Sequence, residues 1–143
     1  MLPQNYVLAG NQTMTPGGDQ LIGNFVTPVL SPGTYKFTVD LNYETGGASG
    51  TPNFAFHGPA APSLQAITGL ISGGGGEQPF QVAGSSAFAS VVMTGSGDFY
   101  NVNLVYAVTT TAAGTVSFQG HASANTFTVA AGAAMTVMSA TLS

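Results

Sequence analysis

The stretch that decides the fold is SPGTYKFTVDLNYETGG, residues 31–47. Every second residue from Tyr35 to Tyr43 is apolar or aromatic, and the residues between them are polar or charged. This alternation predicts a half-buried antiparallel strand, because successive side chains of a strand point to opposite faces. Lys36, the chain's only basic residue, shares the polar face with Asp40. We therefore expect both charges on the solvent-facing or subunit-facing side of a sheet.

The same alternation recurs in DFYNVNLVYAVTT, residues 98–110, which predicts a second long strand. Shorter strand candidates, separated by Gly, Pro, Ser and Asn at the spacing of an all-β sandwich, are residues 24–30, 52–58, 86–94, 114–120, 125–130 and 134–142. APSLQAITGLI, residues 61–71, fits either a single helical turn capped by Ser63 or a short strand. The low-complexity segment SGGGGEQ, residues 72–78, predicts a mobile loop joining two strands.

The composition is unusual in its charge. Hydrophobic residues make up 44% of the 143 residues, but charged residues make up only 4%, where about a quarter is typical. Low charge removes both the repulsion between molecules and the cost of stripping water from charges in an interface. Such a surface suits a protein that works inside an assembly. The alternative is a secreted monomer with a coat of Thr and Ser.

Several classes of partner are excluded by what the sequence lacks. The chain has one basic residue, Lys36, and a net charge of -4, so it has no cluster of basic side chains that could neutralise phosphates. We therefore expect no nucleic acid partner. The absence of cysteine excludes disulfides and thiolate metal sites, and leaves the compartment open. No long apolar window and no signal-peptide pattern are present, so we expect no membrane partner and synthesis in the producer's cytosol.

Catalytic chemistry is also poorly represented. His57 and His121 could meet in space as metal ligands, but no third ligand stands at a metal-binding spacing, so we expect no metal and no cofactor. No serine sits in a nucleophile elbow. Asp40 and Glu44 would lie about 13 Å apart along an extended strand, too far to act as a glycosidase pair. The sequence therefore predicts a protein that is not an enzyme.

Three segments resemble a known family: LSPGTYKFTVDLNYETG at residues 30–46, PNFAFHGPAAPS at 52–63 and TTTAAGTVSFQGHASANTFTVAAGAAMTVMSATL at 109–142. Their order is similar to the strand-and-turn pattern of tumour-necrosis-factor-like jelly rolls in tailed-phage virion proteins, from Phe25 to Leu142. The resemblance implies an antiparallel jelly-roll sandwich assembled as a trimer, with no catalytic residues. Members of the family serve as capsid decoration proteins or as domains of tail and fibre proteins. The chain shows no coiled-coil or collagen-like stem pattern, which favours the decoration role.

The resemblance therefore implies a capsid decoration, or cement, protein. It would be made in the host cytoplasm and would bind the major capsid protein on the virion surface as a homotrimer. A receptor- or glycan-binding tip of a phage tail or fibre is the first alternative, and a secreted carbohydrate-active jelly roll is the second. We expect residues 25–143 to form the jelly roll and residues 1–24 to form an N-terminal arm or a first strand. Candidate capsid-docking residues in this segment are Gln4, Asn5, Tyr6, Val7 and Leu8.

Overall fold

A computed structural model describes residues 3–45, 52–73, 76–84, 90–92, 99–122 and 125–140. This part of the chain contains twelve strands and no helix, which confirms the all-β prediction. The strands are β1 (Gln4–Val7), β2 (Gln12–Met14), β3 (Gln20–Val26), β4 (Gly33–Thr45), β5 (Pro52–His57), β6 (Leu64–Gly73), β7 (Gly76–Gly84), β8 (Ser90–Val92), β9 (Phe99–Thr110), β10 (Ser117–Ala122), β11 (Phe127–Val129) and β12 (Ala134–Ser139).

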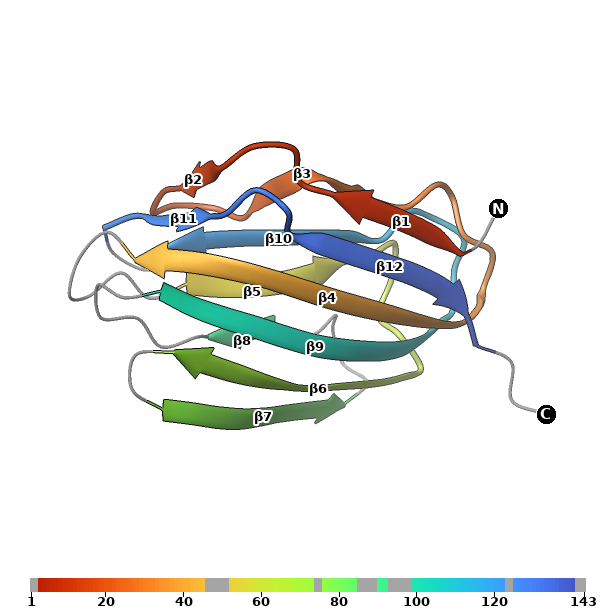
Figure 1. Ribbon diagram of the computed structural model, residues 1–143. Helices are drawn as coiled ribbons and strands as arrows, with labels where there is room; N and C mark the ends of the chain where they lie inside the picture. Colours follow the sequence, from red (N-terminus) through yellow and green to blue (C-terminus); the bar gives the residue numbers. More distant parts are fainter. Residues whose placement is uncertain are drawn as a thin grey trace.

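The strands form two antiparallel sheets that lie face to face (Figure 1). The larger sheet has eight strands, with the order β1-β12-β4-β9-β6-β7, and β11 pairs with both β4 and β2. Since β11 and β12 pair with successive parts of β4, they continue one another along its edge. The smaller sheet has the order β3-β10-β5-β8. The chain crosses repeatedly between the sheets, as from β3 to β4 and on to β5.

The two long strands predicted from the sequence are β4 and β9, and they form the centre of the larger sheet. They pair without interruption from Gly33 opposite Thr110 to Glu44 opposite Phe99. Their inward side chains meet aromatic rings of the smaller sheet, and the Phe56 ring stacks on Tyr106 with centroids 4.2 Å apart. Side chains alternate between buried and outward-facing along both strands, which confirms the predicted buried face of each.

The middle of the chain decides one open alternative and corrects one prediction. Of the two alternatives for residues 61–71, the strand is the one observed, since residues 64–73 form β6 and pair along their length with both β9 and β7. Most of the expected glycine-rich loop is also strand, since β6 extends to Gly73 and β7 begins at Gly76. Ladder hydrogen bonds hold a glycine-rich backbone extended even though glycine has low strand propensity. Residues 74–75 lie outside the described part of the chain.

Some strand limits also differ from the sequence prediction. The strand expected at residues 24–30 begins earlier, at Gln20, and ends at Val26; Pro28, which has no backbone N–H to donate, follows shortly after. The strand expected at residues 86–94 is described only as β8, Ser90–Val92. The other limits agree to within a few residues.

The N-terminal segment covers one edge of the larger sheet. β1 pairs with β12 over four residues, and β2 pairs with β11 over three. Tyr6, Leu8 and Met14 are buried in the core, with Met14 fully enclosed. The backbone between β1 and β2 is also fixed, since Leu8 and Ala133 share a hydrogen bond of 2.8 Å. Residues 4–14 are therefore an integral part of the sandwich edge.

Candidate interaction face

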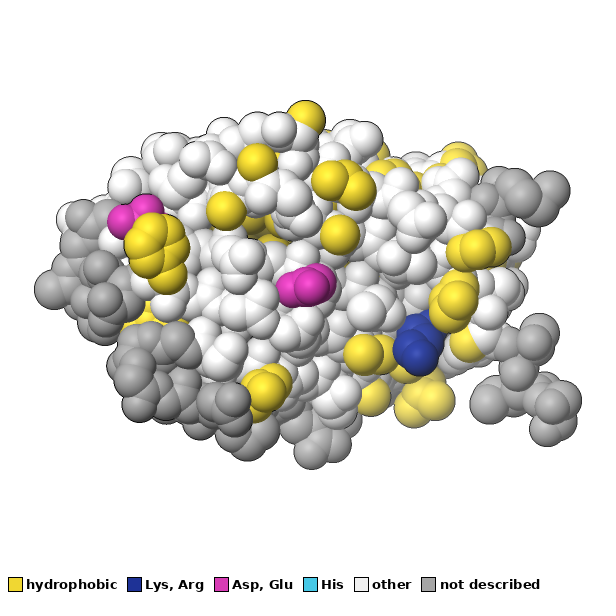
Figure 2. Space-filling model, in the orientation of Figure 1, with side chains coloured by type: hydrophobic (Ala, Val, Ile, Leu, Met, Phe, Trp, Pro, Cys, Tyr) yellow, Lys and Arg dark blue, Asp and Glu magenta, His cyan; other side chains and the backbone are white. Residues whose placement is uncertain are grey.

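The larger sheet has an outer surface that faces away from the smaller sheet, and we call it the outer face. It consists of the even-numbered residues of β4, β6 and β12 and the odd-numbered residues of β1 and β9, which point away from the core. Figure 2 shows it as a broad surface with few charged side chains and scattered hydrophobic ones. The strict alternation of β4 and β9 creates this separation.

Polar side chains on the outer face bond mainly to one another. Asn101 donates from Nδ2 to Oδ1 of Asn42 at 2.8 Å and to Oδ1 of Asp40 at 3.2 Å. Asn103 donates to Oδ1 of Asn101 at 2.6 Å. Hydroxyl groups form further cross-strand bonds, Thr34 with Thr109 and Thr136 with Asn5. Because these groups already have partners, covering the face costs less than covering unpaired polar groups.

Exposed apolar side chains concentrate on the same face. Among the side chains that the structure describes, seven large hydrophobic ones are exposed. Five of them lie on the outer face: Val7, Leu64, Leu70, Phe99 and Met138. Phe99 is the most exposed of these five, at 70%. They are spread singly over the face, from β1 to β6 across the sheet and from Met138 to Phe99 along it.

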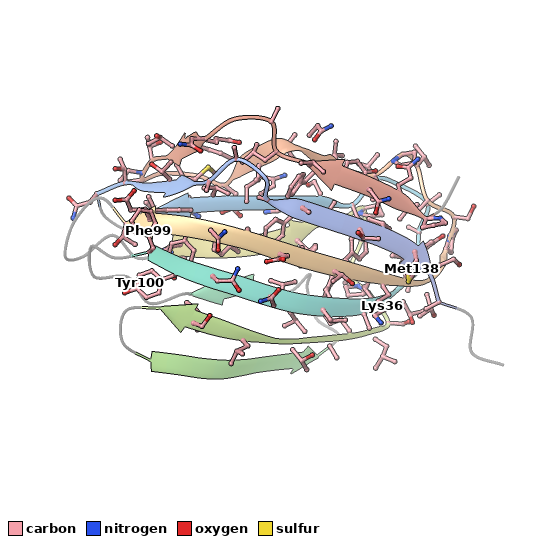
Figure 3. The ribbon with its side chains drawn as sticks, in the orientation of Figure 1. Lys36, Phe99, Tyr100 and Met138 are labelled. Atoms are coloured by element: carbon pink, nitrogen blue, oxygen red, sulfur yellow. The ribbon has the colours of Figure 1, made fainter. Side chains whose placement is uncertain are left out.

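Charges on the outer face are few and regularly spaced along β4. Lys36, Asp40 and Glu44 all point outward at intervals of four residues. Lys36 lies opposite Met138 of β12, and Glu44 lies opposite Phe99 of β9. Figure 3 shows Lys36 and Met138 together at one end of the sheet and Phe99 at the other. The two ends of the face therefore carry opposite charges.

A small hollow lies next to Lys36. It encloses about 130 Å³ and is lined by Leu64, Ala66, Ala107, Val108 and the hydroxyl pair Thr34 and Thr109. The two hydroxyl oxygens are 2.9 Å apart and bond to each other. The hollow therefore presents mainly apolar atoms to its surroundings.

The sequence-predicted docking residues divide between this face and the core. Tyr6 and Leu8 are buried, and the Tyr6 hydroxyl donates to Oε1 of Gln4 at 2.5 Å. Asn5 and Val7 point outward on β1. Of this group, Asn5 and Val7 are thus the side chains best placed to meet another molecule. Their role in docking stays a prediction.

The opposite sheet brings the two histidines together through Asp19, a residue that the sequence analysis did not single out. His57 Nε2 lies 2.7 Å from Oδ2 of Asp19, and His121 Nδ1 lies 2.5 Å from Oδ1. A carboxylate only accepts, so both rings donate. Burial raises the pKa of Asp19, but the hydrogen bonds and charges of His121 and His57 outweigh this, and the pKa of the carboxyl lies below its ordinary value.

This histidine cluster joins separate segments of the fold. Asp19 precedes β3, His57 ends β5 and His121 belongs to β10. Each histidine occupies a different carboxylate oxygen. Within the described ranges, no three His, Cys, Asp or Glu residues are grouped so that they could hold a metal ion. The geometry instead fits a structural role. The hydrogen bonds of Asp19 to His57 and His121, which we call the clasp, fix the β2–β3 connection to the smaller sheet.

Replacing Asp19 by asparagine tests the clasp. The lowered pKa means that the ionised carboxylate stabilises the fold above the ordinary aspartate pKa, and that this contribution is lost as pH falls through the folded value. We expect D19N to lower the free energy of unfolding by about 1–2 kcal/mol near pH 6. Urea unfolding should show this difference shrinking as the pH falls below the ordinary aspartate pKa. A difference that is constant over this range would contradict the clasp.

Comparisons with known proteins leave the family open. No family model matches the chain, and no curated protein matches it. Within the described residues, no helix could span a lipid bilayer.

Proposed function

We propose that this protein is a virion structural protein that decorates the outside of a phage head as a trimer and stabilises it. The observation that carries the proposal is the outer face: a broad surface with only three charged side chains, internal hydrogen bonds between its polar groups, and five exposed apolar side chains. Surfaces of this kind associate with other proteins at low desolvation cost.

The strand order supports a jelly-roll assignment within this proposal. In a jelly roll, successive strands alternate between two antiparallel sheets. Here β3, β5, β8 and β10 belong to the smaller sheet, while β4, β9, β11 and β12 belong to the larger one. The hairpin β6–β7 then extends the larger sheet beyond β9. From the resemblance to tumour-necrosis-factor-like virion proteins, we expect the protein to form a trimer and to bind at the capsid surface.

The mechanism is binding rather than chemistry. Each copy would contribute modest contacts, and the trimer would join three of them into one multivalent unit. A head offers repeated copies of the same site, so linked weak contacts add to a stable attachment. β1 is suited to such contacts, because its outward residue Val7 is 59% exposed at the sheet edge.

A receptor- or glycan-binding tip is the second candidate, and one feature favours it. A hollow of about 350 Å³ is lined by His57, Thr115 and Ser117 together with Pro59 and two glycines. Hydroxyl and imidazole groups around a depression suit a polyhydroxylated ligand. The number of copies per particle separates the two roles, since a cement protein coats the head whereas a tip is present in a handful of copies.

Co-sedimentation with undecorated heads tests the decoration role. The wild-type chain should pellet with heads in amounts comparable to the major capsid protein. We expect Val7→Asp to weaken this binding at least tenfold, because it places a charge in the predicted contact. Val29→Asp is the matched control, since Val29 is 71% exposed but lies outside the outer face. Equal binding by both variants would exclude β1 as the docking edge, and no binding by the wild type would contradict decoration.

A further inference from the structure

The hollow on the outer face combines an apolar lining with a positive charge beside it. Leu64, Ala66, Ala107 and Val108 supply the apolar lining. Lys36, the only basic residue of the chain, lies directly opposite Ala107 across the β4–β9 pair. We propose that this hollow binds the C-terminal residue of a partner protein. An aromatic or large aliphatic side chain enters the hollow, and the terminal carboxylate meets the Lys36 ammonium.

Strand register creates the hollow and sets its size. Ala107 of β9 lies opposite Ala66 of β6, and two residues further along both strands Thr109 lies opposite Leu64. All four side chains point outward. The two alanine methyl groups beside larger side chains leave a depression of about 130 Å³. Since an apolar cavity of about 150 Å³ holds a benzene ring, the hollow has room for one such side chain.

The polar groups at the border of the hollow already have partners. The hydroxyl oxygens of Thr34 and Thr109 lie 2.9 Å apart and bond to each other. An apolar group that enters the hollow therefore leaves neither hydroxyl unsatisfied, which avoids the main cost of covering polar atoms. Hydrogen bonding, in turn, gives a polar ligand little reason to enter.

Lys36 has no ion-pair partner within the ranges that the structure describes. The ion pairs there are those of Asp19 with the two histidines. Asp40, the next acid on the same face of β4, is four residues away, which is about 13 Å along an extended strand. At physiological ionic strength the attraction over that distance is largely screened. Lys36 is therefore available to a carboxylate from another molecule.

A chain terminus presents an apolar group and a carboxylate in the required proximity. Both are attached to the same Cα atom. In an extended internal segment, by contrast, adjacent side chains point to opposite faces, and those on one face are about 7 Å apart. Lys36 and Ala107 are cross-strand neighbours, whose Cβ atoms lie about 5 Å apart. Their spacing therefore matches a terminal residue better than an internal pair of side chains.

This inference rests on the proposed function, in which the outer face meets another protein. On a phage head, the terminus would belong to a capsid subunit. A site that accepts one residue binds weakly by itself. It suits the modest contacts that a multivalent trimer adds together.

Two model compounds test the chemistry on the full-length protein. N-acetyl-phenylalanine carries both the ring and the carboxylate, and its amide lacks only the charge. We expect the acid to bind about threefold to fivefold more tightly, the contribution of one exposed ion pair. In a heteronuclear NMR titration, the shift changes should centre on the backbone amides of Ala66 and Ala107. Equal binding of acid and amide, or shift changes centred elsewhere, would overturn the proposal.

Variants separate the charge from the hollow. K36M should abolish the preference for the acid and retain binding of the amide, whereas Ala107→Leu should weaken both at least tenfold by filling the hollow. Asp40→Asn is the charge control on the same strand. Ala131→Leu, exposed in the turn between β11 and β12, is the volume control. Both controls should bind the acid as the wild type does. An acid preference that survives K36M would overturn the role of Lys36.

A second hollow-filling variant guards against damage to the fold. Ala66→Leu fills the hollow from β6 instead of β9 and should act like Ala107→Leu. Far-UV circular dichroism and the thermal midpoint identify any variant that is misfolded. Wild-type affinity for N-acetyl-phenylalanine in either folded variant would show that the ring does not enter the hollow.

A blocked tripeptide that ends in phenylalanine distinguishes a chain terminus from a free small carboxylate. The hollow opens on the outer face, where Leu64 at its border is 64% exposed, so the rest of a peptide can continue over the sheet. We expect the tripeptide to bind at least as tightly as N-acetyl-phenylalanine. Rejection of the tripeptide would indicate a site for small carboxylates and overturn the chain terminus.

Co-sedimentation with heads judges the proposed function separately. Ala107→Leu should weaken binding to heads at least tenfold, and Ala131→Leu should not. Binding to heads that is unchanged in Ala107→Leu would overturn the terminus as a capsid contact while leaving decoration standing. A wild-type chain that binds N-acetyl-phenylalanine at the hollow but not heads would support the site and contradict decoration.

Discussion

Replacing Phe37 by alanine should lower the free energy of unfolding by about 3–5 kcal/mol, as for other fully buried aromatic residues. The Phe37 side chain is completely enclosed at the centre of β4. Its ring centroid lies 5.4 Å from that of Phe56 in the other sheet and 5.9 Å from that of Tyr106. Truncation would therefore leave a cavity where the two sheets meet. Urea unfolding followed by circular dichroism measures the change.

The neighbouring residue supplies the control for this prediction. Thr38 points outward on the same strand, so Thr38→Ala should change the free energy of unfolding by less than about 1 kcal/mol. Similar losses at Phe37 and Thr38 would mean that the two faces of β4 are assigned wrongly. Such an error would shift the register of the whole larger sheet, because a slip of one residue exchanges the faces.

Removing residues 1–18 should prevent stable folding altogether. The deletion takes away β1 and β2 and the buried side chains of Tyr6, Leu8 and Met14. Each such truncation costs about 2–5 kcal/mol, so together they approach the entire stability of an ordinary domain, about 5–15 kcal/mol. The deletion would also leave the outer edges of β12 and β11 without partners.

The state of the truncated chain can be followed by circular dichroism and by size-exclusion chromatography. We expect loss of the cooperative unfolding transition, together with aggregation through the exposed strand edge. Thr13→Ala is a suitable control in the same segment, because Thr13 is exposed and shares only one hydroxyl hydrogen bond, of 3.3 Å, with Thr128. A truncated chain that folds into a normal trimer would mean that these residues are a dispensable arm.

The long strands could be predicted from the sequence because their alternation is strong and local. Tyr35 to Tyr43 specify a buried face without any knowledge of their partners. The hairpin β6–β7 could not be predicted in this way, since its glycine-rich sequence has little pattern of its own. It is extended because β9 supplies a template along β6.

The interaction features depended on contacts between distant residues. The sequence placed Lys36 on a polar face, but the hollow beside it exists only because Leu64 of β6 lies opposite Thr109 of β9. Likewise, Asp19 is 102 residues from His121 along the chain, and no local pattern links them. The hollow and the Asp19–His121 contact both depend on how the strands are paired, and short sequence motifs do not specify that pairing.

The mass of the wild-type protein in solution tests the central claim, that this nearly uncharged sandwich works by assembling through its outer face. Multi-angle light scattering at micromolar concentration should give about three times the chain mass of 14.3 kDa. The value should persist in moderate salt, because a chain with only six charged side chains offers little charge for salt to screen. A mass equal to that of a single chain at this concentration would contradict the account.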